Sequence, residues 1–280
     1  MKLKIFAGIF LMLIMLTGCG NETPQNQEKV QKVGMLTRAN LDEDKIDEYT
    51  KNFNAEHGIT ADAQKTTYYN NLNSMQMGLT AGNIDTIRTY GSVATYMLSQ
   101  NSQLKIKDSQ AIQLVDTFSC ALRENDKDLR EEFDAAIDAM KNDGTLEDLI
   151  NRYIKSENND TPVAVAMPHF DGAEIVKVGV TGDLPPLDFV NADGTPAGFN
   201  TAVLSEISKC INKNIELIVI ESDARAAALV SGRVDVIFWV VTPEGVSPYP
   251  TNSDTPAGVA LTQAYYQDVV VDVGLSGIFQ

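Results

Sequence analysis

The nonapeptide Leu79-Thr-Ala-Gly-Asn-Ile-Asp-Thr-Ile87 recurs further along the chain as Leu229-Val-Ser-Gly-Arg-Val-Asp-Val-Ile237. Both copies keep the leucine, the glycine, the aspartate and the final isoleucine. An apolar helical pattern precedes each glycine and β-branched residues follow it, which is typical of a glycine C-cap, a short turn and a buried strand. Upstream of the copies, Val33-Gly-Met-Leu-Thr37 and Val178-Gly-Val-Thr-Gly182 each predict a strand that runs into a helix start. The chain is therefore predicted to hold two α/β units of similar design, and the cleft expected between them indicates ligand binding.

The first residues have the features of an export signal. Lys2 and Lys4 form a positive start, and the apolar run over residues 5–16 is too short to cross a bilayer as a stable helix. The run ends in Leu16-Thr-Gly-Cys19, which resembles the lipobox of bacterial lipoproteins. That resemblance implies removal of residues 1–18 as a signal peptide and a membrane anchor of acyl chains, such as palmitate, on Cys19. The alternative is an ordinary signal peptide that contains a cysteine.

Composition bears on the partners of the protein. The formal net charge of −16 argues against nucleic acid and anionic lipid headgroups. His57 and His169 have no cysteine or histidine neighbours at metal-ligand spacing, so no metal site is predicted, and no cofactor is expected. Cys120 and Cys210 remain beside Cys19; export could oxidise them, but two separate thiols are favoured because the sequence gives no geometry for a bond.

Alternating strand and helix patterns divide the chain. Residues 19–31 are polar and are predicted to form a flexible tether. Residues 32–115 form the first α/β unit, residues 116–155 a strand and two closing helices, residues 156–174 a linker, and residues 175–280 the second α/β unit. The second unit includes a small hairpin around residues 191–194 and a last strand within residues 261–271. Repeated β-α-β order calls for mostly parallel sheets with right-handed crossovers.

Four segments of the second unit resemble bacterial extracellular solute-binding proteins of the amino-acid type. They are Val178-Gly-Val-Thr-Gly-Asp-Leu-Pro-Pro-Leu187, Asp193-Gly-Thr-Pro-Ala-Gly-Phe199, Ser231-Gly-Arg-Val-Asp-Val-Ile237 and Leu261-Thr-Gln-Ala-Tyr-Tyr266. In that family they occur in this order in lobe I, and the last leads into a strand that crosses to lobe II. Residues 79–87 with 93–96 resemble the family's lobe II, and residues 120–129 with 143–146 resemble its closing helices.

The resemblance implies a two-lobe, type II periplasmic-binding fold, but the lobes occur in inverted order. Family members run from lobe I to lobe II and then to the closing helices. This chain begins with the segment that resembles lobe II and ends with the segment that resembles lobe I, so it is predicted to be a circular permutant. The alternative is a pair of truncated lobes that associate with other chains.

The family's ligand contacts are only partly present. The family holds an amino-acid carboxylate with an arginine in a Thr-Pro-Glu-Arg pattern, where this chain has Thr242-Pro-Glu-Gly245. Tyr90 stands where the family has an aspartate for the ammonium, and Arg38-Ala39 replaces a Gly-Thr pair. Arg38, Arg88 and Arg225 are the available cations. The predicted ligand-binding residues are Arg38, Tyr90, Asp183, Phe189, Arg225, Trp239 and Thr242.

Each of these residues also has a structural interpretation. An arginine is often a solvated surface residue, and an aromatic side chain is often part of the core. Trp239 is predicted to lie at the carboxyl end of its strand, where ligands of open α/β sheets bind, and to form an apolar wall. Asp183 belongs to a loop that Pro185-Pro186 stiffens, so its carboxylate either binds an ammonium or solvates the loop.

The function implied by the resemblance is capture of a small polar solute, an amino acid or a related anion, by an extracytoplasmic, lipid-anchored protein that serves the permease of an ABC importer. A sensor or recruitment lipoprotein without a transport role is the alternative. A hydrolase or lyase on the same fold is disfavoured, because the sequence contains no Ser-His-Asp set, no Cys-His pair in context and no HExxH motif.

Overall fold

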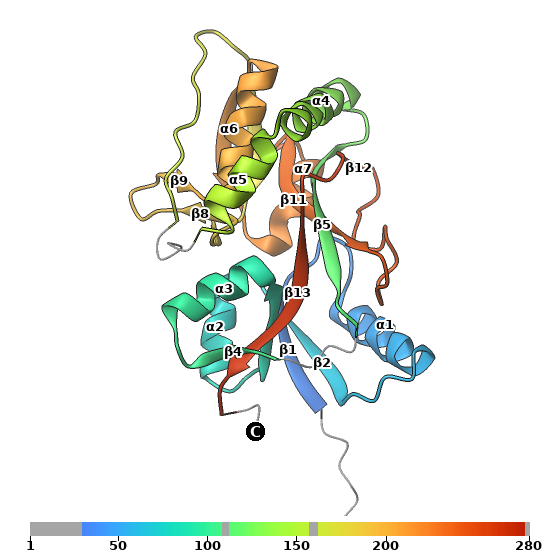
Figure 1. Ribbon diagram of the computed structural model, residues 1–280. Coiled ribbons are helices and arrows are strands. Elements are labelled where there is room, and N and C mark those ends of the chain that lie inside the picture. The colour runs from blue at the N-terminus through green and yellow to red at the C-terminus, as the bar shows by residue number, and fades with distance from the viewer. Residues whose placement is uncertain (1–29, 108–111, 157–161, 278–280) are drawn as a thin grey trace, which may run out of the picture.

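The computed structural model describes residues 30–107, 112–156 and 162–277, which form two α/β lobes (Figure 1). The predicted mixed α/β class with two lobes is confirmed. The signal peptide, Cys19 and nearly all of the tether lie outside the described residues, so these expectations stay predictions. Within the described ranges, no helix combines the length and the apolar character needed to cross a membrane.

The first lobe is a parallel sheet flanked by helices. β1 lies between β2 and β3 and is parallel to both. Its elements are β1 (Val30–Leu36), α1 (Glu43–Glu56), β2 (Ala63–Tyr69), α2 (Leu72–Thr80), β3 (Thr86–Tyr90), α3 (Gly91–Gln100) and β4 (Leu104–Ile106).

The second lobe repeats this order of strands. β6 lies between β10 and β11 and pairs in parallel with both. A small antiparallel sheet of β7, β8 and β9 contains the hairpin predicted around residues 191–194. The elements are β6 (Ile175–Val180), β7 (Asp183–Leu184), β8 (Asp188–Val190), β9 (Pro196–Ala197), α6 (Phe199–Ile211), β10 (Asn214–Val219), the 3-10 turn η1 (Ser222–Ala224), α7 (Arg225–Val230), β11 (Val236–Glu244) and β12 (Val259–Leu261).

The repeated nonapeptide forms the same joint in both lobes. Gly82 and Gly232 have φ angles of +74° and +73°, a left-handed conformation that glycine adopts at little cost where a helix ends. Each strand then begins at Thr86 or Val236, two residues later than the apolar pattern predicts. The delay arises because the intervening residues complete the turn.

The shared aspartate of the nonapeptide ties β3 and β11 to the first strand of their lobes. Asp85 donates its N–H to the carbonyl of Lys32 at 2.8 Å, and its Oδ2 accepts from Lys32 N at 2.8 Å. Asp235 makes the same pair of bonds to Lys177, at 2.8 Å and 3.0 Å. The repeat therefore persists because both lobes use one side chain to fix the register of two parallel strands.

Replacing Asp85 or Asp235 with alanine should lower the free energy of unfolding by about 1–2 kcal/mol, since a backbone N–H loses a charged acceptor. The loss should be larger for Asp235→Ala, because Asp235 also accepts from Arg123 Nη2 at 3.1 Å. Urea denaturation measures both values, with Asp171→Ala, at a fully exposed aspartate, as control. Equal stability of all four proteins would contradict the assignment.

Two long strands connect the lobes. β5 (Val115–Arg123) pairs with β11 and with the first half of β13 (Tyr266–Leu275). The second half of β13 pairs with β3 and β4 of the first lobe. The segment 175–280 is thus not one spatial unit, because residues 270–275 complete the sheet of the first lobe (Figure 1).

The helices that follow β5 lie against the second lobe. α4 (Lys127–Asp143) and α5 (Thr145–Tyr153) both contact α6. Lys213 reinforces this packing with a 2.7 Å ion pair to Glu132 of α4. Cys120 is buried in β5 and Cys210 is exposed on α6; both thiols are free. The arrangement leaves the ends of β1, β3 and β11 facing one another between the lobes.

Candidate binding pocket between the lobes

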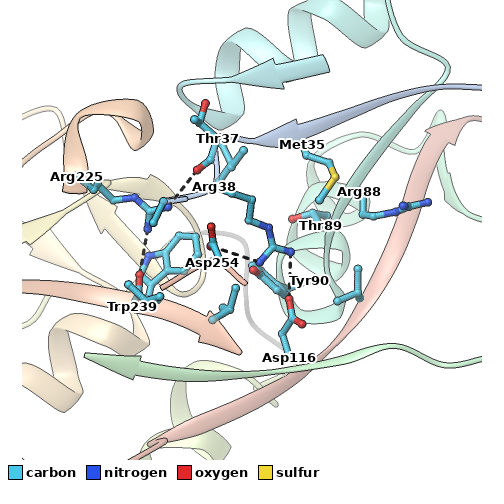
Figure 2. A pocket seen from close by; sticks show the side chains of 15 residues that line it. Met35, Thr37, Arg38, Arg88, Thr89, Tyr90, Asp116, Arg225, Trp239 and Asp254 are labelled. Atoms are coloured by element: carbon cyan, nitrogen blue, oxygen red, sulfur yellow. Dashed lines mark hydrogen bonds and ion pairs between the residues drawn. The ribbon is translucent and has the colours of Figure 1, made fainter. Parts of the chain in front are cut away.

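A pocket lies where the two lobes meet, and both lobes supply its walls (Figure 2). Thr37 and Arg38 follow the end of β1, and Tyr90 is the last residue of β3. The other side is formed by Arg225 at the start of α7 and by Trp239 on β11. Four of the seven predicted ligand-binding residues therefore line one pocket: Arg38, Tyr90, Arg225 and Trp239.

Arg225 is a buried cation without an anionic partner. Its side chain is only 4% exposed, and among the described residues no carboxylate lies within ion-pair distance of it. The guanidinium donates to three backbone carbonyls: Ser222 at 3.3 Å, Trp239 at 3.0 Å and Thr37 at 3.2 Å. Burial lowers the pKa of Arg225. Since a guanidinium has five N–H groups, these three bonds leave two of them without an acceptor among the described residues.

Trp239 forms the apolar wall against this guanidinium. The Arg225 Cζ lies 4.7 Å from the centre of the Trp239 ring, and Tyr90 meets the same ring edge-on at 6.0 Å. Trp239 does not end its strand as predicted, because β11 continues along β5 to Glu244. The parallel pairing with β6 nevertheless stops at Ile237, so Trp239 stands just past the carboxyl end of the parallel part.

The backbone at Trp239 is strained. Its φ angle is +60°, at a break in the register between Ile237 and Val240. A left-handed conformation is rare for a bulky side chain and costs about 1–3 kcal/mol. The carbonyl of this residue accepts the hydrogen bond from Arg225 Nη1, and its indole Nε1 is buried without a partner in the described part of the chain. Such strain is typical of a functional site.

Arg38 contrasts with Arg225, because two carboxylates face it. Its Nη2 lies 3.4 Å from Asp116 Oδ2, and its Nη1 lies 4.0 Å from Asp254 Oδ2. Burial by itself lowers the pKa of Arg38, but Tyr90, Asp116 and Asp254 outweigh this effect and raise it. Figure 2 shows both arginines reaching into the same space from opposite lobes.

Three predicted residues do not line this pocket. Thr242 lies on β11, where its hydroxyl is 2.7 Å from that of Thr117. Phe189 belongs to β8 and pairs with Asp183 and Ala197 in the small sheet. Asp183 accepts from the Leu72 N–H at 2.7 Å, so it caps α2 of the opposite lobe. These residues therefore shape the second lobe or join the two lobes.

Asp116 and Asp254 are pocket residues that the sequence did not reveal. Asp116 lies on β5, and Asp254 lies on the loop of residues 245–258 between β11 and β12. A signal for Asp254 was present, since loops of this length without secondary structure are uncommon and often functional. Nothing in the sequence pairs either aspartate with Arg38.

The pocket is nearly closed in this arrangement of the lobes. Its volume is about 30 Å³, which is room for roughly one or two water molecules and not for an amino acid. Neither histidine lines it, and no cluster of metal-ligating side chains occurs among the described residues. Any solute of the predicted class therefore requires the lobes or the loop to move apart.

Asp183 gives the contact between the lobes a dependence on pH. Burial is the main cause that raises the pKa of Asp183 to about 6, and Asp188 and Glu221 add to it. Because this value lies above the ordinary 3.8, the carboxyl destabilises the folded state progressively as the pH rises from about 4 to about 6.

The Asp183→Asn variant should therefore gain thermal stability relative to the unaltered protein as the pH rises through that window, and the difference should level off above about pH 6. Melting temperatures between pH 4 and pH 8 measure the effect. Asp193→Asn is the matched control: the Thr195 N–H lowers the pKa of Asp193, so its stability effect falls below about pH 4 and its difference from the unaltered protein should stay nearly constant between pH 4 and pH 8. A constant difference in melting temperature between Asp183→Asn and the unaltered protein across the range would contradict the role of Asp183.

One family model matches part of the second lobe. Residues 176–244 match the model of the bacterial extracellular solute-binding proteins, family 3. The match supports a relationship to that family over a minority of the chain, which includes Arg225 and Trp239 but not Arg38 or Asp254. No curated protein matches the sequence.

Solved structures resemble the chain over most of its length. The ligand-binding component of an ABC-type import system from Staphylococcus aureus, with zinc bound, has a TM-score of 0.44 at 12% identity, with coverage of 89% of this chain and 66% of that protein. The chain thus spans just under two thirds of the length of that protein. The methionine-binding protein MetQ has a TM-score of 0.41 at 12% identity, with coverage of 89% and 84%. At such TM-scores these resemblances do not bear on the ligand of this chain.

Proposed function

We propose that this protein is an extracytoplasmic solute-binding protein, anchored by lipid on Cys19, which captures a small solute between its lobes for the permease of an ABC importer. The observation that carries the proposal is Arg225, a buried cation at a pocket between two lobes with no carboxylate within ion-pair distance among the residues that the structure describes. Burying an uncompensated charge is costly, and an anionic ligand would offset that cost. The family match over residues 176–244 supports the same function.

The chemistry of the pocket favours a small carboxylate, such as an amino acid or a related organic acid. The two unused N–H groups of Arg225 can bind a carboxylate, for which the planar guanidinium is well suited. Trp239, with Tyr90 against its edge, offers an apolar surface beside that position. Closure of the lobes around the solute would exclude water and strengthen these polar contacts.

We propose further that the inverted order of the lobes is a circular permutation of the family's order. The packing of α4 and α5 on α6 supports this. These helices resemble the family's closing helices, and α6 belongs to the segment that resembles lobe I, which is the lobe they are expected to pack against. The alternative of truncated lobes that pair with other chains is disfavoured by β13, which joins both sheets within one chain.

A thermal-shift screen tests the function. The mature chain, carrying Cys19→Ser so that it stays in solution, is heated with amino acids, short peptides and organic acids. A true ligand should raise the melting temperature with the logarithm of its concentration and alter the fluorescence of Trp239, the single tryptophan. A broad screen without any hit would refute solute capture and favour the recruitment lipoprotein.

The lipid anchor is tested separately. Mass spectrometry of the membrane fraction should show an acylated Cys19 at the start of the mature chain. An intact N-terminus that begins at Met1 would refute this part of the proposal.

A further inference from the structure

The loop of residues 245–258 begins and ends in the second lobe, but two of its side chains contact residues of the first lobe. It starts after β11 and ends before β12, both in the second lobe. Gly245 and Gly258 mark its ends with φ angles of +68° and +77°, and a Cβ at either position would meet nothing within 4 Å. We call residues 245–258 the strap.

Tyr249 anchors the strap in the first lobe. Its side chain is 9% exposed and packs in a small cluster with Val33, Met35, Leu41 and Ile46. Its hydroxyl lies 3.4 Å from Thr50 Oγ1 of α1. The strap therefore holds the two lobes together through a buried apolar contact.

Asp254 is bound by the first lobe in the manner of an anionic ligand. Its Oδ1 accepts from the N–H groups of Asn40 at 2.9 Å and Leu41 at 3.2 Å. Its Oδ2 lies 4.0 Å from Arg38 Nη1, and the side chain is 7% exposed. Two backbone N–H groups and a guanidinium around one carboxylate are the elements of an anion site. Asp254 also lines the pocket that contains Arg225.

We propose that the strap is a closing element of the pocket and that Asp254 is a built-in competitor, which fills an anion site at Arg38, Asn40 and Leu41 until a solute carboxylate displaces it. The small volume of the pocket supports this, because a solute must displace part of the wall in order to enter. The glycines at both ends allow the strap to swing away while the strands stay paired. The ligand class rests on the proposed function, whereas the motion of the strap does not.

Hydrogen exchange measured by mass spectrometry tests the motion. In Asp254→Asn, peptides that cover residues 38–42 and 245–258 should exchange at least about tenfold faster, while peptides from β5 and α6 keep their rates. Asp171→Asn, at a fully exposed aspartate, is the matched control. Unchanged exchange at residues 38–42 in Asp254→Asn would refute the proposal that Asp254 holds the strap against the first lobe.

Titration with succinate, followed through Trp239 fluorescence, tests the competition. Because Asp254 occupies the site most of the time, its removal should tighten succinate binding by about tenfold or more. Adding Arg38→Met to Asp254→Asn should abolish that gain. Equal or weaker binding by Asp254→Asn, or no binding at 10 mM (roughly the range expected for a weak single-carboxylate site), would overturn the competitor role. A failed solute screen together with faster exchange would refute the proposed function and leave the strap standing.

Discussion

Replacing Arg225 with methionine should weaken binding of the captured solute by roughly 10- to 100-fold. A charge-assisted hydrogen bond to a buried ligand contributes about 1.5–3 kcal/mol, which corresponds to that range of affinity. Arg225 is 4% exposed and has no carboxylate within ion-pair distance among the described residues, so a ligand carboxylate at the guanidinium would be its nearest counter-charge. Isothermal titration with the solute found by the thermal screen measures the effect.

Two further variants test whether the loss of affinity is specific to the Arg225 guanidinium. Arg233→Met removes the same charge from an exposed position in the same segment and should leave affinity unchanged. Arg225→Lys should fall between the two, because a lysine keeps the charge but not the planar fork of donors. The melting temperature of Arg225→Met should fall moderately, because methionine cannot replace the hydrogen bonds that Arg225 donates to the carbonyls of Ser222, Trp239 and Thr37. Full affinity for the solute in Arg225→Met would show that the solute does not bind at Arg225.

Asp272→Ala should be among the most destabilising single substitutions in the chain, with a loss of about 3–5 kcal/mol. The carboxylate of Asp272 on β13 accepts hydrogen bonds from Arg88 Nε at 2.8 Å and from Arg88 Nη2 at 2.9 Å. The pair is bidentate, and the side chains of Arg88 and Asp272 are 11% and 6% exposed. Alanine would leave the Arg88 guanidinium buried without its counter-charge. Because a domain of this kind is stable by only about 5–15 kcal/mol, the loss is a large fraction of the total.

The matched control removes both charges together. Arg88→Met with Asp272→Leu should recover most of the stability, because apolar residues of similar volume replace a buried ion pair at little net cost. Urea denaturation of Arg88→Met, of Asp272→Leu and of the double variant gives the coupling energy between the residues. A loss below about 1 kcal/mol for Asp272→Ala would mean that water reaches the pair and screens it.

Local patterns predicted the elements well, because caps and turns act over a few neighbouring residues. The helix start at Asn71 is one example: the side chain accepts from Ser74 N at 2.9 Å, which is the cap that an asparagine before a helix favours. The repeated nonapeptide is another, since its glycine and aspartate make the same turn and the same strand contact in both lobes. The residues that determine such caps and turns lie within one short stretch of sequence, so they can be predicted without knowledge of distant segments.

Part of the pocket could also be predicted from sequence. Arg38, Tyr90, Arg225 and Trp239 stand at or near the ends of parallel strands or at helix starts, and parallel strands bring such ends to one edge. The same reasoning misplaced Asp183, Phe189 and Thr242, because it does not tell which side of a strand or hairpin faces the other lobe.

The tertiary structure alone decided which charges meet. Arg38 finds Asp116 and Asp254 across large separations in the chain, whereas Arg225 meets carbonyl oxygens and the Trp239 ring, with no carboxylate within ion-pair distance in the described part of the chain. The relative position of the lobes sets these distances, and that position results from the summed packing along β5, β13 and the strap rather than from any local motif. The sequence by itself therefore determined two α/β lobes with cations at their facing ends, while folding in three dimensions determined that Arg38 meets two carboxylates and that Arg225 meets none within ion-pair distance among the described residues.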